Sequence, residues 1–119
     1  MSCPHSIVKS LQKRQAFKQV YSRGRYAADP LFVVYALANE TGQNRIGLTV
    51  SKKVGNAVVR NRVRRWLKES FRLMANELKT GHDLVIIARA SMGTMPKDGA
   101  FGKVNDSIGR LFHRLGVKQ

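Results

Sequence analysis

The chain has 119 residues, of which 22 are Lys or Arg and 7 are Asp or Glu, for a formal net charge of +15. This length fits one domain, and a hydrophobic content of 43% can build its core, which argues against a wholly disordered basic tail. No stretch approaches the roughly 18 apolar residues of a membrane span. We therefore expect a single domain over residues 1–119, with about residues 1–10 loosely ordered and no membrane partner.

The cysteine and histidine content argues against disulfide and metal frameworks. Cys3 is the only cysteine, so no intrachain disulfide can form, and the N-terminus lacks the apolar core of a signal peptide. The three histidines, His5, His82 and His113, are scattered without metal-ligand spacing. These features predict a cytoplasmic protein with no metal or cofactor of its own.

The charge is concentrated in the middle of the chain and indicates a polyanionic partner. Residues 45–72 hold nine Lys or Arg and a single acid, Glu69. Nucleic acid is the abundant polyanion of the cytoplasm, which favours RNA or DNA as the partner. The alternatives are a solvated basic surface without a ligand, and an anionic membrane, which usually needs an amphipathic helix with an exposed apolar face.

The first half of the chain predicts a helix and two strands. Helical spacing of apolar residues predicts a helix over about 13–23, ended by Gly24 as a C′ residue. Residues 31–38 are β-branched and aromatic and follow Pro30, while residues 45–53 alternate apolar and polar. We expect these two strands to pair as a hairpin around a turn at 39–44.

The second half predicts two helices around a buried strand. Asn56 is a good N-cap for a helix that runs to about Lys79, and Gly81 ends it. Residues 83–89 are continuously apolar, which is typical of a strand buried on both faces and indicates a crossover to a parallel neighbour. After a loop at 91–97, residues 101–115 form an amphipathic helix. The expected order is α, β, β, α, β, α, a sheet with helices packed against it.

The long helix combines an apolar stripe with a cationic face. At 100° per residue, Val59, Val63 and Trp66 share one side, and the opposite side is almost purely basic. Arginine suits bidentate phosphate contacts, whereas a solvated face usually mixes charges of both signs. The residues of this face and its flanks are Arg60, Asn61, Arg62, Arg64, Arg65, Lys68 and Arg72.

Three aromatic residues form a second candidate surface. Phe17 and Tyr21 are four residues apart on the first helix, and Tyr35 lies on the strand over 31–38. If this helix lies beside the sheet, the three rings line one groove, where unpaired bases could stack. The alternative is an ordinary core, which the sequence by itself favours.

Residues for protein-based catalysis are missing from the sequence. The few carboxylates form no obvious pair, and there is no Ser-His-Asp or Cys-His pattern. The glycine-rich segments lack the Lys-Ser/Thr ending of a phosphate-binding loop. If the protein belongs to an enzyme, another component supplies the chemistry.

Residues 45–72 resemble the bacterial ribonuclease P protein component. The shared pattern is a strand that ends in Ser-Lys-Lys, then Gly-Asn-Ala, then Arg-Asn-Arg on a helix. These are Ser51-Lys52-Lys53, Gly55-Asn56-Ala57 and Arg60-Asn61-Arg62 here. The likeness covers nearly the whole chain but is weak after Arg89. The first helix of the family often carries Asp where this chain has Ala16.

The resemblance implies a fold, and separate roles for the protein and its RNA partner. The fold would be a two-layer α/β (α+β) sandwich with a mixed sheet of about four strands and a left-handed β-α-β crossover through the basic helix. The protein would bind a catalytic RNA, and the RNA, with its own Mg²⁺ ions, would cleave the 5′ leader from precursor tRNA. No side chain of the protein would be catalytic.

The resemblance also assigns residues to the two RNAs. Phe17, Tyr21 and Tyr35 match aromatic positions that hold the single-stranded leader. The basic helix and the residues before it would face the catalytic RNA. This second set is Lys52, Lys53, Asn56, Arg60, Asn61, Arg62, Arg64, Arg65, Lys68 and Arg72. The alternatives are a ribosomal or other structured-RNA-binding protein without a catalytic partner and, with less support, a DNA-binding regulator, for which no short helix-turn-helix signal is present.

Overall fold

The computed structural model describes residues 9–11 and 13–118. The expected looseness of the first ten residues, together with Cys3 and His5, mostly concerns positions outside the described residues. Lys9–Ser10 forms a short strand, β1. No helix among the described residues is long and apolar enough to cross a membrane.

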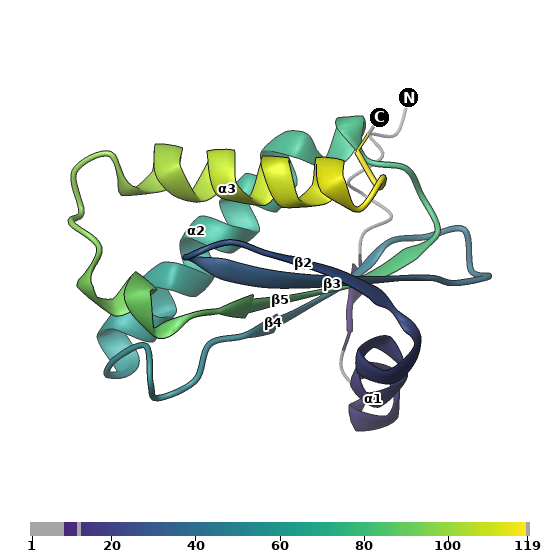
Figure 1. Ribbon diagram of the computed structural model, residues 1–119, viewed down its shortest axis with the longest axis horizontal. Coiled ribbons are helices and arrows are strands. Elements are labelled where there is room, and N and C mark those ends of the chain that lie inside the picture. Colours follow the sequence, from purple (N-terminus) through teal and green to yellow (C-terminus); the bar gives the residue numbers. More distant parts are fainter. Residues whose placement is uncertain (1–8, 12, 119) are drawn as a thin grey trace.

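Five strands form one mixed sheet in the order β1-β4-β5-β3-β2, with helices on both faces (Figure 1). Helices α2 and α3 cover one face and give the predicted two-layer α/β sandwich, while α1 lies against part of the other face. The elements in chain order are β1, α1 (Arg14–Arg23), β2 (Arg25–Ala28), β3 (Phe32–Ala38), β4 (Arg45–Thr49), α2 (Ala57–Met74), the 3₁₀ helix η2 (Ala75–Glu77), β5 (His82–Ala88), the 3₁₀ helix η3 (Ala90–Thr94) and α3 (Ala100–Arg114).

The predicted hairpin between residues 31–38 and 45–53 is wrong. Strand β5 lies between β3 and β4, antiparallel to β3 and parallel to β4. Its central residues are apolar on both faces and buried, so this continuously hydrophobic strand takes the central position of the sheet. The hairpin that does form joins β2 to β3 through the turn at Asp29-Pro30. The predicted parallel crossover from β4 through α2 to β5 is confirmed, and its left-handedness stays a prediction.

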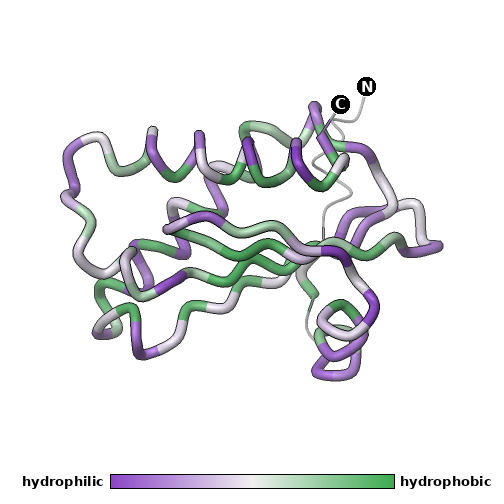
Figure 2. The backbone as a smooth tube through the Cα atoms, viewed as in Figure 1, coloured by the Kyte–Doolittle hydropathy of each residue, from purple (hydrophilic) through white to green (hydrophobic). Residues whose placement is uncertain are grey.

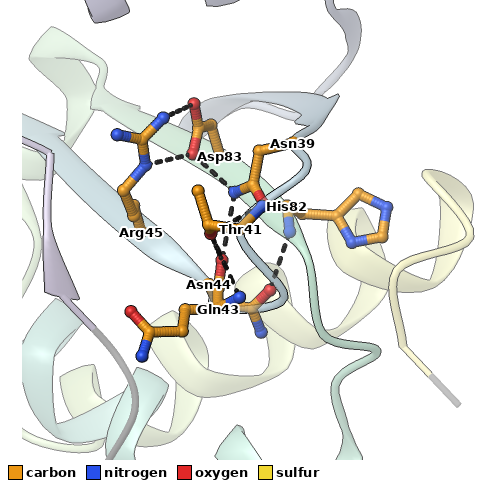
Figure 3. A network of polar contacts seen from close by, with 7 residues as sticks. All are labelled: Asn39, Thr41, Gln43, Asn44, Arg45, His82 and Asp83. Atoms are coloured by element: carbon orange, nitrogen blue, oxygen red, sulfur yellow. Dashed lines mark hydrogen bonds and ion pairs between the residues drawn. The ribbon is translucent and has the colours of Figure 1, made fainter.

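A polar network holds the starts of β4 and β5 together (Figure 3). Arg45 donates from Nε and Nη2 to the two carboxylate oxygens of Asp83 at 2.7 and 2.6 Å. Asn39 also donates to Asp83, and Asn44 accepts from the backbone N–H of His82. The hydrogen bonds that Arg45 donates to Asp83 raise the pKa of Arg45. Side chains of the 39–44 segment therefore bind the first residues of β5, rather than closing a tight β3–β4 turn.

The two faces of the sheet carry cores of different size. Phe32, Val34 and Ile86 belong to the larger core beneath α2 and α3, whereas Val85, on the opposite face, joins a smaller cluster with Leu11 and Val20. In Figure 2 the central strands are hydrophobic, and hydrophilic stripes mark the outward sides of the helices. Phe17 and Tyr35, two of the three predicted aromatic residues, pack against the smaller cluster and are only partly buried.

Helix α1 occupies the predicted range, but Gly24 has a different reason to be glycine. Its backbone is extended, at φ −81° and ψ 162°, and not left-handed as a C′ glycine would be. A Cβ at this position would lie 2.5 Å from the carbonyl oxygen of Val20 and 2.9 Å from that of Ala36. Gly24 therefore lets the end of α1 approach β3 closely.

Two predicted elements are shorter than expected. The strand predicted over 45–53 ends at Thr49, the last residue of β4 that pairs with β5, and Val54 then closes a turn by donating to the carbonyl of Ser51. The helix predicted to reach Lys79 ends at Met74 and continues only as η2. Periodicity alone does not separate these forms, because a 3₁₀ turn prolongs the helical spacing of apolar side chains.

Candidate nucleic-acid interface

Helix α2 presents one face to the core and the other to solvent. Asn56 begins the helix, and its side chain accepts a hydrogen bond from the backbone N–H of Val59 at 3.0 Å, as predicted for an N-cap. Val63, Leu67 and Phe71 are buried in the larger core. Because these residues fix the rotation of the helix, the residues between them point outward.

The outward face of α2 brings four of the eight predicted cations together. A shallow depression of about 430 Å³ runs along it. Its lining residues are Asn61, Arg64, Arg65, Lys68, Glu69 and Arg72. Arg65, Lys68 and Arg72 are exposed, and Arg64 is half-buried. We call this surface the α2 face. It is a concave, positively charged strip of about three helical turns.

Two cations of the α2 face already have partners within the protein. Arg72 donates to both carboxylate oxygens of Glu69, at 3.0 and 2.5 Å, which lowers the pKa of Glu69 and raises the pKa of Arg72. Arg64 donates to the side-chain oxygen of Asn61 at 3.2 Å. None of the ion pairs among residues 9–11 and 13–118 involves Arg65 or Lys68. These two side chains are the most available to an external phosphate.

The remaining predicted residues lie on the flanks of the α2 face or before it. Arg60 and Arg62 are half-buried, and the Nε of Arg60 is buried without a hydrogen-bond partner among the described residues. Lys52 and Lys53 are exposed in the turn between β4 and α2. Asn56, which the family resemblance also assigns to RNA binding, uses its side-chain oxygen to cap the helix.

Phe17, Tyr21 and Tyr35 are brought together, and Tyr26 extends them into a row of four rings. The ring centroids of Phe17 and Tyr21 are 6.4 Å apart, and those of Tyr21 and Tyr35 are 5.1 Å apart, edge to face. Tyr26 follows, with its centroid 5.5 Å from that of Tyr35. We call these four residues the aromatic row; it contains all three tyrosines of the chain.

The aromatic row combines the two interpretations that the sequence left open. Phe17 and Tyr35 are half-buried and pack against the smaller core. Tyr21 is 40% exposed and Tyr26 is 66% exposed. One side of the row therefore belongs to the core, while the other side offers ring surface to solvent.

The sequence prediction missed Tyr26 because it missed β2. This strand has only four residues, with no clear alternation of apolar and polar side chains. A usable signal was Asp29-Pro30, a turn dipeptide directly before the strand over 31–38. The register then places Tyr26 directly opposite Tyr35 on the same face.

The α2 face and the aromatic row belong to opposite sides of the sheet. Tyr35 and Val85 point toward the α1 side, while Val34 and Ile86, which alternate with them, point toward α2. Figure 1 shows α1 and α2 separated by the strands. The protein can therefore contact two segments of a polyanion at once. Among the described residues, no group of three or more His, Cys, Asp and Glu is placed to hold a metal ion.

Comparisons with known proteins place the chain in one family. The family model for ribonuclease P matches residues 8–115. The ribonuclease P protein component of Alkaliphilus metalliredigens is 43% identical over 105 residues, covering 88% of this chain and 91% of that protein. The corresponding protein of Clostridioides difficile is 43% identical over 110 residues, with 92% and 93% covered. The solved structure of Staphylococcus aureus RNase P protein matches with a TM-score of 0.82 at 30% identity, covering 92% of this chain and 97% of that one.

Proposed function

The chain belongs to the ribonuclease P protein family as a subunit of that RNA-containing enzyme, and from this premise we propose which RNA each of its two surfaces binds. The α2 face binds the catalytic RNA subunit. The aromatic row binds the single-stranded 5′ leader of precursor tRNA. The RNA subunit performs the hydrolysis that removes the leader, and the assembly works in the cytoplasm.

The observation that carries the proposal is the unneutralised charge of the α2 face. Arg65 and Lys68 are exposed and take part in none of the described ion pairs, and Glu69 is the only acid on this face. Concentrating like charges on one helix face is unfavourable for the isolated protein. A dense array of phosphates, such as a folded RNA, relieves this repulsion and releases its own counterions.

The aromatic row has the chemistry that unpaired nucleotides need. Base–aromatic stacking is worth about 1–3 kcal/mol per base and tolerates any sequence, because every base has a π face. A stacking surface therefore holds a single strand without requiring particular bases, unlike hydrogen bonds to base edges. Mature tRNA lacks the leader and would not use the row.

The residues of the α2 face do not fit a magnesium site of the protein. Mg²⁺ requires hard oxygen ligands in octahedral geometry. The carboxylate present there, on Glu69, is already bound by the guanidinium of Arg72. The proposal therefore assigns Mg²⁺ to the RNA subunit. The cations of the protein instead reduce repulsion between phosphates of the two RNAs.

Reconstitution tests the proposal. The protein is combined with the catalytic RNA of the same organism, and cleavage of precursor tRNA is measured at low Mg²⁺ with and without protein. We expect the protein to increase cleavage and to tighten binding of precursor tRNA more than that of mature tRNA. A protein that binds unrelated structured RNAs equally well and leaves cleavage unchanged would instead be a general RNA-binding protein.

A further inference from the structure

Tyr26 is the most exposed ring of the aromatic row. It lies on β2, the edge strand of the sheet, with 66% of its surface accessible. Among the described residues, Tyr21, at 40%, is the only other exposed aromatic side chain. The small buried part of this side chain contributes little to stability, because the hydrophobic effect scales with the area removed from water.

The geometry places this ring in continuity with the others. Tyr26 pairs directly with Tyr35 across the β2–β3 ladder, which puts the two side chains on one face. Their ring planes are inclined by only 33°, whereas Tyr21 meets Tyr35 edge to face at 79°. The order of contacts is Phe17, Tyr21, Tyr35, Tyr26, so Phe17 and Tyr26 are the two ends of the row.

We propose that Tyr26 is a fourth leader-contacting residue, which extends the stacking surface of this protein to the open edge of its sheet. The inference rests on the proposed function of the other three rings. The leader would then contact four rings instead of three. Because Phe17 and Tyr26 lie at opposite ends of the row, a leader must be longer to reach both of them. Phe17 and Tyr26 then respond to different leader lengths.

The competing role for Tyr26 is purely structural. A cross-strand aromatic pair stabilises an edge strand, by about 0.2–1 kcal/mol, and removing it could loosen β2. Tyr26→Thr removes the ring and introduces a β-branched residue that also favours strands, and Tyr26→Phe keeps the ring without the hydroxyl. Arg25→Ala, at the adjacent position on the opposite face of the same strand, is the matched control.

The test uses holoenzyme reconstituted with each variant and precursor tRNAs whose leaders lengthen one nucleotide at a time. For long leaders we expect Tyr26→Thr to weaken binding by at least about fivefold, the value of one lost stacking contact. Short leaders, mature tRNA, Tyr26→Phe and Arg25→Ala should show little change. Tyr21→Ala, measured in parallel, reports on the proposed function itself.

The outcomes separate the inference from its premise. If Tyr21→Ala weakens leader binding while Tyr26→Thr binds every leader like wild type, the fourth contact is refuted and the proposed function stands. If Tyr26→Thr weakens binding of precursor and mature tRNA equally and lowers the melting temperature, its role is structural and the inference fails. If Tyr21→Ala also has no effect on leader binding, the leader-binding function of the whole row is wrong.

Discussion

Gly47 and Phe17 form the contact on which the aromatic row depends most closely. Gly47 is buried in β4 beneath the ring of Phe17, and a Cβ built there would lie 2.5 Å from Cζ and 2.6 Å from Cε1 of that ring. Carbon atoms in good contact are about 3.5–4.0 Å apart. Gly47→Ala therefore requires the ring to move by about 1 Å or more.

The expected cost of Gly47→Ala combines two opposing effects. Overpacking in a core costs about 1–3 kcal/mol. Replacing glycine in a strand returns about 0.5–1 kcal/mol of backbone entropy, since Gly47 is not among the glycines with positive φ. The net expectation is a loss of about 1–2 kcal/mol, or roughly 4–8 °C in melting temperature for a domain of this size.

A double-mutant cycle measures this contact directly. Urea unfolding is followed for wild type, Gly47→Ala, Phe17→Ala and the double variant. In the Phe17→Ala background, Gly47→Ala should be neutral or stabilising, because the obstructing ring is gone. Gly102→Ala is the control: it lies in α3 with no atom within 4 Å of the added Cβ, and it should stabilise by about 0.5–1 kcal/mol.

The same substitution should also weaken leader binding. Displacing the Phe17 ring removes one end of the aromatic row, so the precursor tRNA affinity of Gly47→Ala should approach that of Phe17→Ala. Binding to the catalytic RNA should not change, since α2 lies on the opposite side of the sheet. An equal stability cost of Gly47→Ala in both backgrounds would refute the packing described for this site.

Three further predictions concern charge. Arg65→Ala combined with Lys68→Ala should weaken binding to the catalytic RNA and reduce its salt dependence, while changing stability by less than about 0.5 kcal/mol per exposed site; Glu69→Gln should strengthen binding by freeing Arg72. Filter binding and thermal melts measure these effects, and a double variant that unfolds or keeps its affinity would contradict the prediction. With about six phosphate contacts, affinity for the catalytic RNA should fall about a thousandfold between 50 and 200 mM salt, and a flat titration would contradict the electrostatic account. Burial lowers the pKa of His82, and the nearby charges of Arg25 and Lys79 lower it further, so the contribution of this residue to stability is complete above its ordinary pKa of 6.5 and is lost as the pH falls below it. Urea unfolding across this pH range should show a smaller loss of stability in acid for His82→Gln than for wild type, and identical pH profiles would contradict the prediction.

Local patterns in the sequence were sufficient for the basic helix and its cap. The spacing of Val63 and Leu67 sets the buried side of α2, and therefore also the outward side, without reference to the rest of the chain. Asn56 caps the helix through a bond three residues away. The continuous apolar run of β5 likewise predicted a strand buried on both faces, because that burial follows from composition alone.

Strand pairing and the fourth ring depended on distant contacts. Whether β4 pairs with β3 or β5 is decided by groups far apart in sequence, such as Arg45 with Asp83 and Asn39 with Asp83. Tyr26 has no local signal for its role, which arises only when β2 pairs with β3. The glycine at 24 reflects a close approach to Ala36, which local turn rules do not contain.

The most direct measurement of the central claim is the ratio of precursor to mature tRNA affinity in holoenzymes that carry wild-type or Tyr21→Ala protein. Tyr21 is the most exposed of the three rings predicted from the sequence, so its truncation changes the core least. The account predicts that Tyr21→Ala weakens precursor binding by about five- to a hundredfold, the value of one stacked base, and leaves mature tRNA binding unchanged. An unchanged ratio, or equal weakening for both tRNAs with a large drop in melting temperature, would contradict it.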